Sequence, residues 1–252
     1  MDKGYVQVNY PKNGLAEITF FHPKHNSLPS NLLLELTTVI SNAGEDDRVQ
    51  VIILKSAGNR TFCAGASFDE LLAINDLKTG KQFFSGFANV INACRTCPKL
   101  IIGRVQGKAV GGGVGLASAV DYCLATKYAA VKLSELNIGI GPFVIEPAVK
   151  RKIGLSAFSQ LAINANVFQS AAWAKEKGLY ADVFESAEEL DEAVEQLADY
   201  LLSTNPEAQR LMKKMFCRDT EHWSNLLYER AAMSGALVLS DYTKKALSKI
   251  QV

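Results

Sequence analysis

Residues 100–115 read LIIGRVQGKAVGGGVG, an apolar strand-like run that leads into three consecutive glycines. Without a Cβ atom, Gly111, Gly112 and Gly113 allow a sharp turn and let a ligand approach the backbone N–H groups. The apolar residues 114–120 are compatible with a helix, whose N-terminus would present unpaired N–H donors and favour negative charge. The stretch therefore predicts a strand, a tight turn and a helix that together can bind an oxyanion.

Two better-known glycine motifs do not fit this stretch. A phosphate-binding P-loop requires Gly-Lys-Ser/Thr, whereas valine and leucine follow Gly113 and Gly115. In a dinucleotide-binding fingerprint the third small position would fall on Leu116 or Ser118, which disfavours that motif. On these residues alone, a turn that serves only tight packing remains an open alternative.

A second strand-to-helix turn occurs earlier in the chain. Residues 49–56 (VQVIILKS) are typical of a strand buried on both faces, and the small residues 63–66 (CAGA) come just before a helix expected from about Ser67. Two such turns could hold an acyl oxygen between two N–H groups, and losing one donor of this kind costs about 2.7–4 kcal/mol of transition-state stabilisation. Glu135, in the turn-like segment SELNIG, is a carboxylate that could serve as the acid/base.

The composition indicates one sizeable core, since 48% of the 252 residues are hydrophobic. The net charge is +1 and no block of basic residues occurs, which disfavours nucleic acid and membrane surfaces as partners. No apolar run approaches the roughly 20 residues of a membrane span. The start, MDKGYVQVNY, has the features of neither a signal peptide nor a transit peptide, so we expect a cytoplasmic location.

The five cysteines are an odd number in a chain without an export signal, which predicts reduced thiols. Cys94 and Cys97 have the spacing of a metal or redox pair, but no second pair exists and the histidines are distant in sequence. We therefore expect no metal site, and interpret the pair as the end of a helix stopped by Pro98.

Hydrophobic periodicity predicts an α/β fold built from repeated strand–turn–helix units. The expected strands cover residues 5–9, 15–21, 49–56, 100–105, 121–126, 129–133 and 179–184. The expected helices cover residues 29–43, 67–75, 79–97, 114–120, 147–153, 156–165, 171–177, 185–203, 206–217 and 220–249.

Several segments together resemble the crotonase (enoyl-CoA hydratase/isomerase) superfamily, in its order and spacing and over nearly the whole chain. They are HPKHNSL (22–28), the strand at 49–54, FCAGASF (62–68), GGGVGLASAVDYCLAT (111–126) and KLSELNIGIGP (132–142). The resemblance implies a spiral ββα superhelix over residues 1–190, which holds an acyl-CoA site. It also implies a C-terminal helical trimerisation region over residues 191–252, and hence a homotrimer or a dimer of trimers.

The resemblance also implies roles for individual residues. The N–H groups of Ala66 and Gly112 become the oxyanion hole for the thioester carbonyl, and Glu135 falls on the family's acid/base glutamate. Lys24 matches a contact to a phosphate of CoA, and Lys249 a contact to a neighbouring subunit's CoA. The substrate is an acyl-CoA thioester, and no cofactor is expected besides the CoA of that substrate. The remaining substrate-binding positions are Ala64, Gly111, Gly113, Gly115 and Pro142.

Two departures from the family pattern concern a second carboxylate. Family hydratases with two catalytic glutamates carry one where this chain has Gly115, so the water-activating group is absent there. Glu146 stands just before Pro147, which makes it a candidate second carboxylate or, alternatively, a helix N-cap. Ser67 replaces an aspartate that is common in the family.

Three functions remain open from the sequence. The favoured one is an enoyl-CoA double-bond isomerase, because moving a double bond needs one base that takes a proton and returns it. The second is an enoyl-CoA hydratase, for example of 3-methylglutaconyl-CoA type, and the third is a catalytically lapsed acyl-CoA-binding subunit. Apolar residues expected along the acyl pocket favour a hydrophobic chain: Leu71, Leu72, Ile74, Phe83, Phe84 and Phe87.

Overall fold

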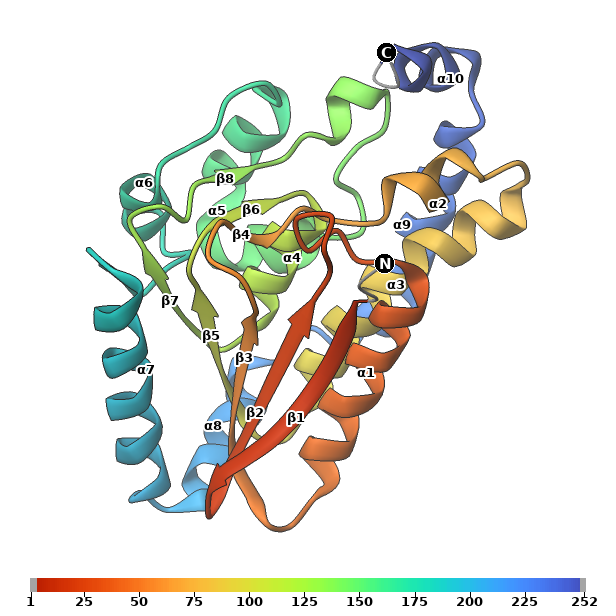
Figure 1. The fold of residues 1–252 in the computed structure, drawn as a ribbon. Helices are drawn as coiled ribbons and strands as arrows, with labels where there is room; N and C mark the ends of the chain where they lie inside the picture. Colours follow the sequence, from red (N-terminus) through yellow and green to blue (C-terminus); the bar gives the residue numbers. More distant parts are fainter. Residues whose placement is uncertain (1–3, 250–252) are drawn as a thin grey trace.

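A six-stranded sheet runs through the molecule, in the order β1-β2-β3-β5-β7-β9 (Figure 1). It belongs to a computed structural model that describes residues 4–249. The first pair is antiparallel and every later pair is parallel. The strands are β1 (Tyr5–Lys12), β2 (Gly14–Phe21), β3 (Val49–Ser56), β5 (Leu100–Val105), β7 (Tyr122–Thr126) and β9 (Asp182–Phe184).

The first hairpin is longer than the sequence predicts. β1 continues past the expected end at Asn9, through Pro11 to Lys12, with a register shift between Asn9 and Lys12. Proline is tolerated because β1 is an edge strand, where a missing N–H breaks no ladder bond. Gly14 then turns the chain with a φ of +83°, a conformation that favours glycine.

Short strands follow three of the parallel strands and form a second sheet, in the order β4-β6-β8. They are β4 (Thr61–Cys63), β6 (Lys108–Val110) and β8 (Val131–Lys132). Each leads into a helix: α2 (Phe68–Leu72), α4 (Gly112–Ala119) and the 3₁₀ helix η1 (Glu135–Ile138). This threefold strand–strand–helix repeat is the ββα spiral that the resemblance implies. β4 and β6 were not predicted because three residues carry no measurable periodicity.

Helices cover both faces of the large sheet. α1 (Ser30–Glu45) and α3 (Leu77–Thr96) pack on one face, and α7 (Ala187–Leu202) packs on the other. α7 buries Leu190 and Val194 against apolar side chains of the strands. The domain boundary expected between 190 and 191 therefore falls inside a helix that belongs to the sheet.

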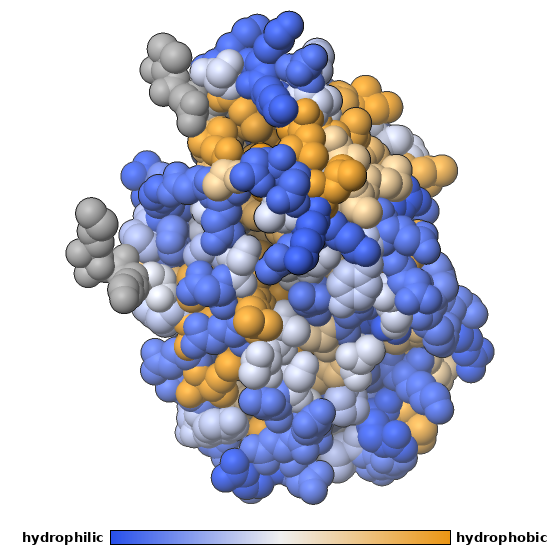
Figure 2. All heavy atoms as spheres, turned by 90° about the vertical axis from the view of Figure 1, so that its right-hand side faces the viewer, coloured by the Kyte–Doolittle hydropathy of each residue, from blue (hydrophilic) through white to orange (hydrophobic). Residues whose placement is uncertain are grey.

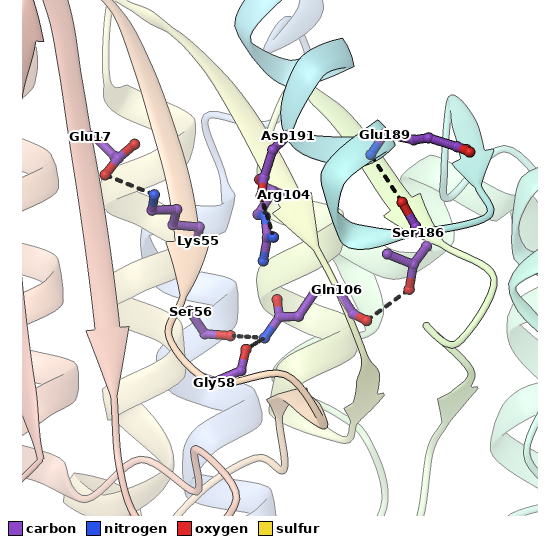
Figure 3. A network of polar contacts seen from close by, with 10 residues as sticks. Glu17, Lys55, Ser56, Gly58, Arg104, Gln106, Ser186, Glu189 and Asp191 are labelled. Atoms are coloured by element: carbon purple, nitrogen blue, oxygen red, sulfur yellow. Dashed lines mark hydrogen bonds and ion pairs between the residues drawn. The ribbon is translucent and has the colours of Figure 1, made fainter.

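Polar contacts also attach α7 to the sheet (Figure 3). Arg104 of β5 forms a bidentate ion pair with Asp191 of α7, in which Nε and Nη2 donate to the two carboxylate oxygens at 2.7 and 2.9 Å. Lys55 pairs with Glu17 at 2.8 Å. A cavity beside these residues is lined by both ion pairs. Because the charged side chains that line this cavity pair with one another, we interpret them as stabilising the contact between α7 and the sheet rather than as a ligand-binding site.

The C-terminal part of the chain is mostly helical. Its first helix, α5, is kinked at Gly154, where φ is +75°. The helices are α5 (Glu146–Ile163), α6 (Ala171–Glu176), α8 (Pro206–Phe216), α9 (Trp223–Val238) and α10 (Asp241–Ser248). The prediction of one helix over 220–249 is wrong, because Ser240 accepts a bond from the Thr243 N–H and caps a new helix. Within residues 4–249, no helix has the length and apolar character needed to cross a membrane.

α9 and α10 fold back onto their own chain. α9 packs along α3, and the two helices approach most closely at two glycines: a Cβ on Gly80 would lie 2.9 Å from the Gly235 Cα. α10 packs on η1, where the Thr243 hydroxyl donates to the Gly139 carbonyl at 3.3 Å. The C-terminal helices therefore border the segment that carries Glu135.

Candidate active site

A cavity of about 310 Å³ lies where the turns after β4, β6 and β8 meet α3. Its wall includes Ala66, Gly112 and Glu135, three of the four residues that the sequence singles out for catalysis. Most of the remaining wall is apolar and comes from α2, α3 and the segment 138–145. The cavity thus joins the predicted oxyanion groups to an apolar compartment that suits an acyl chain.

The two glycine turns lie against each other. A Cβ built on Gly65, whose φ is +90°, would lie 3.5 Å from the Gly112 nitrogen. α4 begins at Gly112, so this N–H is at the start of the helix, where no helical acceptor exists. Among the described residues, neither the Ala66 N–H nor the Gly112 N–H has a hydrogen-bond acceptor. Two free donors therefore border the cavity, as an oxyanion hole requires.

Glu135 begins η1, and its carboxyl group lies directly over the second glycine turn. A Cβ on Gly111, whose φ is +52°, would lie 2.9 Å from Glu135 Oε1. The other oxygen, Oε2, is buried and has no partner within residues 4–249. Burial raises the pKa of Glu135 from 4.5 to about 7, against an opposing contribution from the N–H groups of Glu135 and Ser134. A carboxyl with this pKa can both accept and return a proton near neutral pH.

The candidate second carboxylate is outside this cavity. Glu146 does not line the wall, and its carboxylate pairs with Lys150 one turn along α5. The N-cap prediction for Glu146 is wrong by one residue, since Ile145 caps the helix and Glu146 is its first residue. Among the described residues on the wall, Glu135 is the one ionisable group.

Gly115 and Gly113 have packing roles rather than the predicted substrate contacts. A Cβ on Gly115 would lie 2.5 Å from Ile145 Cγ2, and one on Gly113 would lie 2.2 Å from the Cys63 carbonyl oxygen. Neither glycine lines the cavity. Instead, the Ile145 side chain fills the space above Gly115 and itself forms part of the wall.

Other predicted contacts divide between the wall and the surface. Ala64, Gly111 and Pro142 line the cavity. Lys24 is exposed, and its ammonium group pairs with Asp69 at the start of α2. Lys249 is exposed just after α10, a helix that packs on its own chain's η1. The CoA-binding roles of both lysines remain predictions.

The apolar wall agrees in part with the prediction. Leu71, Phe83, Phe84 and Phe87 line the cavity, whereas Leu72 and Ile74 border a smaller hollow next to α10. Ser234 of α9 and, apart from Pro142, the wall residues of the segment 138–145 were not predicted. The motif KLSELNIGIGP marks the first part of that segment, but its irregular pattern does not show which side chains line a cavity. Ser234 lies about a hundred residues after Glu135, so no local signal connects it to the site. The missed residues of the segment are Ile138, Ile140, Gly141, Phe143, Val144 and Ile145.

The cysteine pair gives no sign of redox chemistry. Cys94 and Cys97 are buried at the end of α3, with free thiols. Burial raises the pKa of Cys94 to about 12, so the reactive thiolate is disfavoured. Within the described part of the chain, no three His, Cys, Asp or Glu side chains are grouped as metal ligands.

Comparison with known proteins places this chain in a family. The sequence profile described as Enoyl-CoA hydratase/isomerase matches residues 11–248. The chain belongs to the enoyl-CoA hydratase/isomerase family. Within this family, part of the crotonase superfamily, the short-chain-enoyl-CoA hydratase of Clostridium acetobutylicum is 31% identical over 206 residues, which cover 81% of this chain and 78% of that protein.

Other family members differ in their reactions. The peroxisomal Delta(3,5)-Delta(2,4)-dienoyl-CoA isomerase of Arabidopsis thaliana is 28% identical over 243 residues, 90% of this chain and 86% of that protein. A crystal structure of an enoyl-CoA hydratase from Bacillus halodurans superposes with a TM-score of 0.91 at 22% identity, and covers 97% of this chain and 99% of that one. The crotonase fold is thereby established. Hydratases and an isomerase are among the relatives, so the reaction has to be argued from the site.

The raised pKa of Glu135 predicts the pH dependence of the reaction. A base must be deprotonated to act, so we expect kcat/KM to rise with pH up to about 7 and then to level off. The measurement is a profile of kcat/KM against pH, with a substrate that dissociates from the enzyme faster than it reacts. An acidic limb centred near the ordinary value of 4.5 would show that Glu135 is solvated in the working enzyme.

The same burial predicts a cost in stability. Because the folded state binds the Glu135 proton more tightly than the unfolded state, the stability contribution of this residue falls as pH rises from 4.5 to about 7. The shift corresponds to about 3 kcal/mol. The glutamine of Glu135→Gln cannot titrate. The unfolding free energy of this variant minus that of the native protein should therefore increase by about that amount from a pH below 4.5 to a pH above 7. Urea denaturation of the two proteins at one acidic and one weakly alkaline pH measures the two unfolding free energies. If their difference is the same at both pH values, the prediction is contradicted.

Proposed function

We propose that this protein is an enoyl-CoA double-bond isomerase in which Glu135 alone carries the proton. The observation that supports this most strongly is the cavity wall, where Glu135 is the one carboxylate among the described residues and two free N–H donors lie beside it. Double-bond migration needs one base, whereas addition of water needs a further group to orient or deprotonate the water.

The proposed steps use only side chains and N–H groups of this wall. The Ala66 and Gly112 N–H groups donate to the thioester oxygen of a 3-enoyl-CoA. Glu135 removes a proton from C2, the C–H electrons pass into the conjugated enolate, and negative charge develops on the oxygen between the two donors. The double bond then forms between C2 and C3 as Glu135 returns the proton to C4. No group besides the CoA of the substrate enters this sequence.

A hydratase is the second candidate, since relatives of this chain carry that name. Its water-activating carboxylate would have to come from a position such as 115, where Ile145 leaves no room for a side chain. The 3-methylglutaconyl-CoA version would also bring a carboxylate into the acyl compartment. Within the described chain no lysine, arginine or histidine lines that compartment, so the extra charge would be unpaired there.

A lapsed binding subunit is the third candidate. A protein that only binds acyl-CoA gains nothing from a buried carboxylate without a partner, which lowers stability. The buried, unpartnered position of Glu135 Oε2 therefore favours catalysis over binding alone.

A rate comparison tests the proposal. The native protein is incubated with 2-enoyl-CoA and 3-enoyl-CoA of matched chain lengths, and hydration and isomerisation are followed separately. We expect isomerisation to be the faster reaction at every length that binds. Hydration on the order of 10 s⁻¹ or more, typical of enzymes, without measurable isomerisation would assign the protein to the hydratases.

A paired substitution tests why hydration should be weak. Gly115→Glu alone forces a side chain into Ile145, so overpacking should destabilise the fold by about 1–3 kcal/mol. With Ile145→Ala in the same chain, the new carboxylate has room, and we expect hydration to rise relative to isomerisation. Ile145→Ala alone is the control. An unchanged ratio in the folded double variant would contradict the idea that the missing carboxylate limits hydration.

Assembly and CoA binding belong to the same proposal. Figure 2 views the side on which α2, α3 and α9 lie, and shows hydrophobic residues gathered on its upper part. α3 and α9 carry the exposed residues Leu77, Met233 and Leu237. An exposed apolar surface is suited to subunit contacts, which supports the proposed homotrimer or dimer of trimers. Lys24 is proposed to bind a CoA phosphate, and Lys249 to approach CoA from the C-terminal helices.

A further inference from the structure

The far end of the acyl compartment contains a hydroxyl group that no part of the proposed mechanism uses. Ser234 of α9 lines the cavity and is only 1% exposed. The hydrogen bonds found within residues 4–249 include none to its hydroxyl. It does not bond back to its own helix, although Ser118 of α4 does so, donating to the Val114 carbonyl at 2.8 Å.

The position of Ser234 along the compartment follows from α3. Phe87 marks the thioester end, because a Cβ on Gly112 would lie 2.4 Å from its ring. Gly80 marks the other end, since it contacts Gly235, the neighbour of Ser234. Seven residues of helix separate Gly80 from Phe87, a rise of about 10 Å. Ser234 therefore lies several carbon–carbon bonds away from the oxyanion hole.

The chemistry of the wall limits what this hydroxyl can meet. Between the two ends the compartment is bordered by Leu71, Phe83 and Phe84, which favour hydrocarbon. The other uncharged polar side chains on the wall, Ser134 and Asn137, belong to η1 at the catalytic end or its cap. A charged group at the far end would find no opposite charge among the described wall residues.

We infer that Ser234 is a specificity residue that recognises an uncharged oxygen, a hydroxyl or keto group, on the distal half of a medium-length acyl chain. The inference rests on the proposed function for the placement of the thioester. A hydroxyl can both donate to and accept from such an oxygen, which would complete its hydrogen bonding. The substrate class is then an enoyl-CoA with a second, remote oxygen function, rather than a plain short-chain one.

Binding measurements test this separately from catalysis. Saturated eight-carbon acyl-CoAs, either plain or with one hydroxyl or keto group at successive positions on the distal half, are titrated into the native protein by calorimetry. We expect one oxygen position to bind about two- to tenfold tighter than the plain chain, the effect of one neutral hydrogen bond. Ser234→Ala should abolish this preference while it keeps affinity for the plain chain.

Ser118→Ala is the matched control, because it removes a buried serine hydroxyl that lies outside the cavity. It should leave the preference intact. The inference is overturned if no oxygenated chain binds tighter than the plain one, or if Ser234→Ala keeps the preference. Since these ligands contain no double bond, a failed isomerase assay would not affect the result, and a failed binding test would leave the isomerase proposal standing.

Discussion

Glu135→Gln should lower turnover by about 10²–10⁴-fold, or about 2.7–5.4 kcal/mol of transition-state stabilisation, and leave affinity for acyl-CoA nearly unchanged. The amide keeps the shape of the side chain over Gly111 but cannot accept a proton. Steady-state kinetics with a 3-enoyl-CoA gives the turnover, and calorimetry with a saturated acyl-CoA gives the affinity.

Glu146→Gln is the matched control for this prediction. It alters a carboxylate that is close in sequence to the wall but is bound to Lys150 outside the cavity. Its turnover should stay near that of the native protein. If Glu135→Gln keeps more than about a tenth of the native activity, the base is another residue, and Glu146 is the first to examine.

Ala66→Pro should be the next most damaging change to catalysis. Proline has no N–H, so the substitution removes one oxyanion donor, at an expected cost of about 10²–10³-fold in kcat. Proline requires a negative φ, and Ala66 is not among the residues with a positive φ. The loss should appear in kcat rather than in KM, because the donor acts mainly on the charge that develops in the transition state.

Ala66→Ser separates the loss of the donor from general disturbance of the turn. It adds an oxygen but keeps the N–H, and should retain most of the activity. Urea denaturation of both variants shows whether the turn still folds. A stable Ala66→Pro protein with native kcat would contradict the oxyanion role of this N–H.

The strand-to-helix turns were predictable because their signals are local. Glycine and small residues between a predicted strand and a predicted helix indicated both turns. The structure confirms both turns: α2 starts just after Ser67, and α4 starts at Gly112, two residues before the predicted start at 114. The resemblance to the crotonase family supplied the spiral arrangement, which periodicity alone could not give. Break points such as Ser240 were missed because a cap residue inside a continuous amphipathic pattern is a weak signal.

The remainder of the site depends on contacts between distant segments. The sequence shows a missing carboxylate at Gly115, but only the structure shows that Ile145 occupies that space. Likewise, the sequence identifies Glu135 as a candidate base, whereas its raised pKa comes from burial by several elements. Ser234 enters the site because α9 packs against α3 through two glycines. Such properties arise from tertiary packing and have no local sequence signature.

Isomerisation of a 3-enoyl-CoA in deuterium oxide tests the single-glutamate account most directly. The product is analysed for the position of deuterium and for 3-hydroxyacyl-CoA, with the native protein and with Glu135→Gln. The account predicts a 2-enoyl-CoA and little hydration product from the native protein, and a rate at least about 10²-fold lower for Glu135→Gln. C4 carries the hydrogen that left C2, or deuterium in the turnovers in which the Glu135 carboxyl exchanges its proton with solvent before it protonates C4. Formation of no 2-enoyl-CoA by the native protein, or an equal rate with Glu135→Gln, would contradict it.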